Sequence, residues 1–209
     1  GIITGNFDAQ EAADLAVLLR AGALPAPLDI IEERSVGPGL GADSVEAGKK
    51  AAIIGIICVC IFMILIYGVF GFLANLSLIA NLFIIVSLLG TIGATLTLPG
   101  IAGIVLTVGM AVDANVLIFE RIKEESKIEK NNIIAFDSGY NRSKTAVIDA
   151  NITTLISAII LFFLGSGPVK GFSVTLGVGI FTTLFSVYFI ARLLTSLYVI
   201  KNKNKEGLI

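Results

Sequence analysis

The 209-residue chain has no histidine and no tryptophan, and only 15% of its residues are charged. Ordinary soluble domains carry about 25% charged residues. Because 56% of the residues are hydrophobic and the mean hydropathy is +0.93, the composition predicts a polytopic membrane protein. Without imidazole, any proton relay in this chain must use carboxylates, hydroxyls or water.

Cysteine and net charge exclude further classes. A net charge of −1 gives no sign of a nucleic-acid partner. Cys58 and Cys60 lie in an apolar run, where helical residues two positions apart point to different sides. We therefore expect packing residues rather than a disulfide or a metal site, and no cofactor. The chain begins at Gly1, without a methionine or a signal peptide, so we interpret it as part of a longer protein.

Five stretches are long and apolar enough to cross a membrane, which takes about 20 residues. The turns expected at 71–75 and 97–99 are short and uncharged, so the first three spans should be antiparallel neighbours. The prediction is a mainly α fold, a membrane bundle of five helices over residues 49–200. The expected spans are 51–70, 76–96, 100–119, 145–164 and 171–193.

Basic residues set the expected orientation. The predicted loop 120–144 and the residues after 191 hold 10 of the 15 lysines and arginines. With five spans these regions share one side, which the positive-inside rule makes cytoplasmic. Residues 1–48 are then periplasmic, and 201–209 form a cytoplasmic tail. Lys49 and Lys50 lie on the outer side, against the rule.

Residues 1–48 are typical of the C-terminal end of a larger α+β domain. Asp8 and Glu11 have the spacing of a capping box and precede an apolar stripe, which predicts a helix over about 8–21. A strand is expected over about 28–36 and a plain turn at Gly37-Pro38-Gly39. One helix and one strand cannot bury a core alone.

Two carboxylates fall inside predicted spans. An aspartate near the bilayer centre costs about 2.5–3.5 kcal/mol, so it is expected to face the bundle interior or a water path. Asp113 lies late in its helix, where the helix dipole disfavours an anion. Asp149 lies about one turn into its helix, where the dipole alone could favour an acid.

Both acids begin the tripeptide Asp-Ala-Asn, which adds Asn115 and Asn151. Measured from the cytoplasmic ends of their helices, Asp113 lies about 10 Å and Asp149 about 7.5 Å deep. Two acids at similar depth, if close, would titrate as a coupled pair. We therefore predict a proton relay formed by Asp113, Asp149, Asn115, Asn151 and Thr107.

The other polar groups in the spans favour simpler roles. Thr153 and Thr154 could line a water path with Thr107, although threonines in membrane helices more often bond their own backbone. Arg192 is expected to extend to the cytoplasmic surface rather than pair with either acid. The glycines of the third and fifth spans are interpreted as positions of close helix packing.

The residues around Asp113 closely resemble the central membrane motif of the SecD family of protein-export subunits. The strongest matches are 98–107, 111–118 and 120–125, and others occur at 18–24, 32–34, 37–38, 149–155 and 170–172. The resemblance covers essentially the whole chain. The family's first membrane helix and most of its periplasmic domain are missing.

The resemblance implies a fold like that of the resistance–nodulation–division (RND) transporters. It implies a non-enzymatic subunit that, with SecF, uses the proton motive force to promote export across the inner membrane. The implied partners are SecF, SecYEG, indirectly SecA, and YajC, with the exported polypeptide as substrate. The family's key membrane carboxylate falls on Asp113, and its counter-charge is implied to be an arginine of SecF.

Three other interpretations stay open. An intramembrane aspartyl protease also uses two acids, but the Gly-x-Gly-Asp of that class is absent at Asp113. An RND-type small-molecule or lipid exporter would give sensitivity to toxic compounds with normal secretion. A non-conducting scaffold, in which the acids only bond helices together, would tolerate Asp113→Asn.

Overall fold

The computed structural model describes residues 5, 8–21, 38–94, 97–129 and 131–202. These residues form helices and short connections, with no strand among them. The chain divides into two compact units, residues 1–37 and 38–209.

The first unit contains helix α1 (Ala9–Ala21), in the place where a helix over about 8–21 was expected. Its first turn has half of the predicted capping box, because Glu11 Oε2 accepts a hydrogen bond from the Asp8 N–H at 3.1 Å. The strand expected over 28–36 lies outside the described residues.

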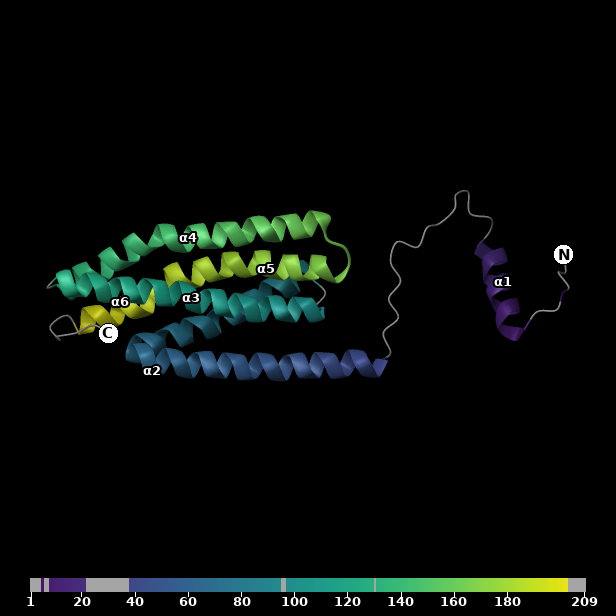
Figure 1. Cartoon of the computed structure of the whole chain (residues 1–209), viewed down its shortest axis with the longest axis horizontal. Coiled ribbons are helices and arrows are strands. Elements are labelled where there is room, and N and C mark those ends of the chain that lie inside the picture. The colour runs from purple at the N-terminus through teal and green to yellow at the C-terminus, as the bar shows by residue number, and fades with distance from the viewer. Residues whose placement is uncertain (1–4, 6–7, 22–37, 95–96, 130, 203–209) are drawn as a thin grey trace. The chain divides into compact units, whose positions relative to one another are not determined.

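Helix α2 (Pro38–Ile92) folds back on itself at Gly68. Asn75 Nδ2 donates to the Cys60 carbonyl oxygen at 2.9 Å, although 15 residues of straight helix would span about 22 Å. Gly68 has φ 53° and ψ −121°, a conformation open mainly to glycine. The turn predicted at 71–75 is therefore at Gly68, and 71–75 are helical. Figure 1 shows the two arms of α2.

The rest of the second unit consists of helices that run back and forth beside α2 (Figure 1). They are α3 (Leu98–Ile128), α4 (Asn132–Leu164), α5 (Pro168–Phe185), the π-helical turn η1 (Ser186–Ala191) and α6 (Arg192–Lys201). In the described part, four helices are long and apolar enough to cross a membrane, with α5, η1 and α6 counted as one. The first two predicted stretches are the two arms of α2, which this count takes as one helix.

Most of the segment 120–144, which was predicted as a cytoplasmic loop, is helical in the structure. Helix α3 continues to Ile128 and α4 begins at Asn132. Glutamate, lysine and arginine are good helix formers, and pairs three or four residues apart stabilise an exposed turn. Arg121 Nη1, for example, lies 2.6 Å from Glu124 Oε2. The turn expected at Gly37-Pro38-Gly39 is likewise partly helical, since α2 begins at Pro38 and proline suits the first turn of a helix.

The core of the second unit is tightly packed where helices meet through glycine. A Cβ on Gly139 of α4 would come within 2.7 Å of the Ile122 Cα of α3. A Cβ on Gly103 of α3 would lie 3.2 Å from Thr175 of α5. Gly109 and Gly177, by contrast, have nothing within 4 Å of a Cβ. The expected close packing therefore holds for some of these glycines and not for others.

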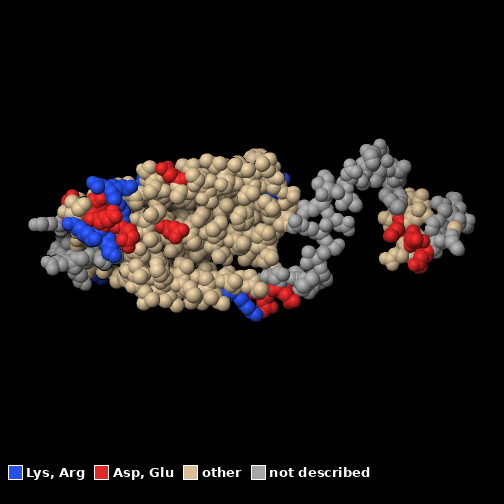
Figure 2. All heavy atoms as spheres, in the orientation of Figure 1, with Lys and Arg blue, Asp and Glu red and all other residues tan. Residues whose placement is uncertain are grey.

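The surface of the second unit matches a lipid environment. Many large apolar side chains are exposed along its helices. Figure 2 shows most of its charged side chains gathered at one end, beyond a long stretch almost free of charge. We call this end, formed by residues 120–144 and 192–202, the charged end. Together with the four apolar helices, this distribution makes the chain part of a multi-pass membrane protein.

Candidate functional site

A cavity of about 220 Å³ lies between α3 and α4, and Asp113 lines it. Each helix contributes four residues with the same spacing of three, one and three positions, the spacing of one helix face. The lining residues are Met110, Asp113, Ala114 and Leu117 of α3, and Val147, Ala150, Asn151 and Thr154 of α4. Asp113 is the only ionisable group among them.

Asp113 itself is exposed in this structure. Among the residues that the structure describes, none forms a hydrogen bond or an ion pair with its carboxyl group. This chain alone therefore does not enclose the carboxyl group in the bundle interior, one of the two places where the sequence led us to expect it.

Asn151 is the second polar group of the cavity, and it is only 6% exposed. Its Nδ2 donates to the Val147 carbonyl oxygen at 2.7 Å, while its Oδ1 has no hydrogen-bond partner among the described residues. A buried carbonyl oxygen without a donor is unfavourable by about 1–3 kcal/mol. Asn151 thus lines the cavity and carries a buried acceptor that has no donor in the described part of the chain.

Asn115 repeats this local geometry on α3, but it does not line the cavity. It is 2% exposed, its Nδ2 donates to the Ala111 oxygen at 3.0 Å, and its Oδ1 has no partner in the described part of the chain. Residues two positions apart lie about 200° apart around a helix. Each Asp-Ala-Asn therefore presents its aspartate outward and its asparagine inward, as the exposure of Asp149 on α4 also shows.

The structure does not bring Asp149 into the cavity with Asp113. Asp149 is exposed and is absent from the lining, whereas its neighbours Ala150 and Asn151 belong to it. Of the residues predicted for the relay, Asp113 and Asn151 line this cavity and Asp149 does not.

Thr107 is also separate from the cavity. It is 1% exposed, and its Oγ1 donates to the Gly103 carbonyl oxygen at 2.9 Å. A Cβ on Gly179 of α5 would collide with this hydroxyl group. Thr107 thus packs at the α3–α5 interface, and its bond to its own backbone is the alternative that the sequence left open.

The remaining predicted groups have local partners. Thr154 lines the cavity, and its Oγ1 donates to the Ala150 oxygen at 3.1 Å, while Thr153 bonds the same oxygen at 2.8 Å. Arg192 pairs with neither predicted acid. Its Nη2 lies 2.6 Å from Asp137 Oδ1, and its guanidinium stacks over the Tyr140 ring, 5.3 Å from the centroid.

One buried acid was missed from the sequence. Glu125 of α3 is 3% exposed at the charged end. Its Oε1 lies 3.0 Å from Arg142 Nη1 of α4 and 3.5 Å from Arg121 Nε. We call these three residues the Glu125 clamp, because they fasten α3 to α4 at one end of the cavity-lining faces. The Arg121 and Glu125 spacing was visible, but nothing in it identified Arg142 as the third member.

A family model described as "Protein export membrane protein SecD/SecF, C-terminal" matches residues 23–201. A second, "SecDF, P1 head subdomain", matches residues 1–26. The protein translocase subunit SecD of Rickettsia prowazekii is 56% identical over 99% of this chain and 40% of its own length. That of Magnetococcus marinus is 55% identical over 99% of the chain and 39% of its own length.

A solved structure extends the match to the fold. The crystal structure of SecDF, a translocon-associated membrane protein from Thermus thermophilus, is 40% identical and superposes with a TM-score of 0.82. The match covers 99% of this chain and 29% of that chain. The chain spans about two fifths of the length of the curated relatives named here. It belongs to the SecD/SecF family of protein-export membrane proteins, and these curated relatives are SecD subunits.

Proposed function

We propose that this chain is the proton-responsive membrane part of a protein-export subunit. The observation that carries the proposal is that Asp113, a carboxylate within a membrane helix, lines the same cavity as Asn151, whose buried Oδ1 has no partner among the described residues. The relatives are named protein translocase subunit SecD, which supplies the export role of the proposal.

The chemistry of the two groups suggests how a proton could change the contact between α3 and α4. An ionised carboxylate can only accept hydrogen bonds, as can the Asn151 Oδ1, so neither group can donate to the other. A protonated Asp113 has one O–H donor and can satisfy Asn151 Oδ1 directly or through water. Protonation therefore favours a closer α3–α4 arrangement and deprotonation a more open one.

The membrane potential supplies enough energy for such a switch. One charge that crosses 100 mV gains about 2.3 kcal/mol. This free energy biases a two-state equilibrium by about fiftyfold, and no covalent step is needed. We therefore propose a transport function without enzymatic activity, driven by the proton motive force.

The proposal includes partners and location. Asp113 is exposed on this bundle, and an arginine of SecF would neutralise it from outside the chain. SecYEG, SecA indirectly and YajC are the further proposed partners, and the exported polypeptide is the proposed substrate. The proposed location is the bacterial inner membrane, with residues 1–48 periplasmic and the charged end cytoplasmic. The distribution of basic residues supports this orientation.

The test compares Asp113→Asn with the matched variant Asp149→Asn. Both remove one carboxylate from a membrane helix, but only Asp113 lines the cavity. In membranes that contain the full-length protein and its SecF partner, we expect Asp113→Asn to abolish the stimulation of export by the proton gradient. ATP-driven export should persist, and Asp149→Asn should retain most of the stimulation.

Full stimulation in Asp113→Asn would refute the proton-carrier role and favour the scaffold. Equal loss in both variants would instead make Asp149 part of the relay. Normal secretion together with sensitivity to toxic compounds would point to the small-molecule exporter.

A further inference from the structure

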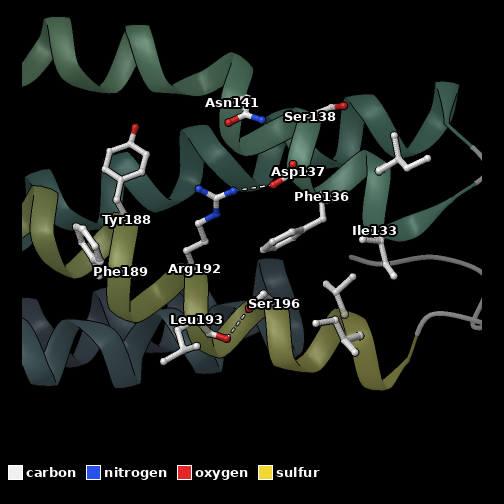
Figure 3. A pocket seen from close by; sticks show the side chains of 13 residues that line it. Ile133, Phe136, Asp137, Ser138, Asn141, Tyr188, Phe189, Arg192, Leu193 and Ser196 are labelled. Carbon is white, nitrogen blue, oxygen red and sulfur yellow. Dashed lines mark hydrogen bonds and ion pairs between the residues drawn. The ribbon is translucent and has the colours of Figure 1, made fainter.

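Arg192 lines two cavities at the charged end, on the surface formed by α4 and the α5–η1–α6 helix. Figure 3 shows the larger of the two. Their volumes are about 570 Å³ and 500 Å³. Both are lined by Asn141, Tyr188, Phe189 and Arg192, so the two cavities adjoin at these residues. We call the two cavities together the Arg192 groove. It is separate from the residues that line the Asp113 cavity.

The groove has an excess of positive charge and hydrogen-bond donors. Its ionisable groups include Lys144, Arg192 and Asp137, two cations against one carboxylate. Asp137 binds Nη2 of Arg192, as Figure 3 shows, but a guanidinium has five N–H donors, so others remain available. Lys144 is exposed, and no ion pair of its ammonium group occurs among the described residues. An anion with several acceptor oxygens fits this end of the groove.

The smaller cavity, which holds Lys144, becomes apolar toward the middle of the bundle along both helices. On α4, Ile148 follows Lys144 by one turn, about 6 Å farther from the charged end. On the other helix, Leu184 and Phe185 precede Arg192 by eight and seven residues, so they lie about two turns farther from that end. In this cavity both walls therefore place cations nearer the charged end and hydrocarbon toward the apolar middle of the bundle. The larger cavity, on the other side of Arg192, is lined mainly by apolar side chains, such as Ile133 and Leu193.

This polarity identifies one class of occupant. We propose that the Arg192 groove binds an anionic glycerophospholipid. Its phosphate lies between Lys144 and Arg192, and an acyl chain lies along Ile148, Leu184 and Phe185. Basic pockets between membrane helices are known to hold anionic headgroups. A free phosphate would leave the apolar wall uncovered, and a zwitterionic lipid would leave the excess positive charge uncompensated.

The contacts of Arg192 suit the assignment. The Asp137 carboxylate and the face of the Tyr140 ring orient its guanidinium within the groove. A cation that is already oriented loses less side-chain entropy when it binds a phosphate.

The experiment uses the full-length membrane protein in nanodiscs with traces of a photoactivatable lipid whose diazirine sits on an acyl chain. One preparation receives the phosphatidylglycerol form and the other the phosphatidylcholine form. We expect phosphatidylglycerol to label peptides that contain Ile148, Leu184 and Phe185, and phosphatidylcholine to label them much less.

Lys144→Gln is the main variant. Among the residues that the structure describes, Lys144 has no ionic partner, so this substitution leaves no carboxylate unpaired. Near a membrane surface one basic residue contributes about 1 kcal/mol to the attraction of anionic lipid, so labelling should fall about fivefold. Lys123→Gln is the matched control. It removes one lysine at the same end, from an exposed pair with Glu120, outside the groove. Its labelling should stay near that of the wild type.

Three results would overturn the proposal. They are equal labelling by the two lipids, an equal loss in Lys144→Gln and Lys123→Gln, and labelling confined to other peptides, as expected if another polypeptide fills the groove. Complete competition by millimolar glycerol 3-phosphate would also overturn it, because it would show a phosphate site that needs no lipid tail.

Discussion

Ser77 and Ser186 bind each other reciprocally between the second arm of α2 and the π-helical turn η1. Ser186 Oγ donates to the Ser77 carbonyl oxygen at 2.9 Å, and the two hydroxyl oxygens lie 2.8 Å apart. Both residues are almost completely buried. Since π-helical turns often mark functional positions within α-helices, this pair ties an unusual backbone segment to its neighbour.

The shared hydroxyl contact predicts coupled effects on stability. Ser77→Ala and Ser186→Ala each remove the contact between the two Oγ atoms, while each leaves one hydroxyl-to-backbone bond in place. We expect each single variant to lower the free energy of unfolding by about 1 kcal/mol. In a double-mutant cycle the coupling should be about 0.5–1.5 kcal/mol. Strict additivity in detergent unfolding would show that the two hydroxyls act independently.

Asn151→Leu and Asn115→Leu separate the function of the cavity from helix stability. Each replaces a buried asparagine whose Oδ1 has no partner among the described residues, so each should be neutral or slightly stabilising. Only Asn151 faces the Asp113 cavity. We therefore expect gradient-stimulated export to fall about tenfold in Asn151→Leu, the effect of losing a bond of about 1.4 kcal/mol. Asn115→Leu should export normally, and equal losses in both would contradict a special role for Asn151.

Glu125→Gln should destabilise the charged end far more than Glu124→Gln. The first leaves Arg121 and Arg142 without their buried carboxylate, although both arginines are partly exposed and screened by solvent. We expect a loss of about 1–3 kcal/mol for Glu125→Gln. Glu124 is 59% exposed, so Glu124→Gln should change the free energy of unfolding by about 0.5 kcal/mol or less. Thermal unfolding of the two purified variants measures the difference, and equal stability would argue against the clamp.

Gly68→Ala tests the reversal of α2, with Gly90→Ala as its control. A Cβ added at either position would have no atom within 4 Å, so packing effects are matched. Gly68 has a positive φ, and alanine there should cost about 1–3 kcal/mol. Gly90 lies within the helical second arm, where alanine should stabilise by up to about 1 kcal/mol. A stabilised Gly68→Ala, measured by thermal unfolding, would mean that the chain does not reverse at this residue.

The sequence predicted the helical membrane fold well because long apolar runs are a strong signal. It placed the reversal of α2 wrongly, since hydropathy is continuous across Gly68 and only backbone conformation distinguishes that glycine from Gly71. It also ended helices where charge begins, whereas charged residues extend α3 to Ile128. Hydropathy locates the apolar part of a helix but not its ends.

The candidate site was predicted in part for a similar reason. Depth along a helix follows from counting residues, and that count compared Asp113 with Asp149. Position around the helix axis depends on packing, and it turns Asp149 away from the lining that Asn151 joins. The Oδ1 atoms of Asn115 and Asn151, which have no partner among the described residues, and the Glu125 clamp both depend on neighbours in three dimensions. Sequence spacing could therefore not reveal them.

The Glu125 clamp also restricts how the cavity can move. It joins α3 to α4 twelve residues beyond Asp113, about 18 Å along α3. Sliding one helix past the other would separate the carboxylate from Arg142, whereas a small tilt about this point would keep the contact. We therefore expect the two helices to tilt apart about the Glu125 clamp rather than slide past each other. Opening the α3–α4 contact near Asp113 then requires very little displacement at Glu125.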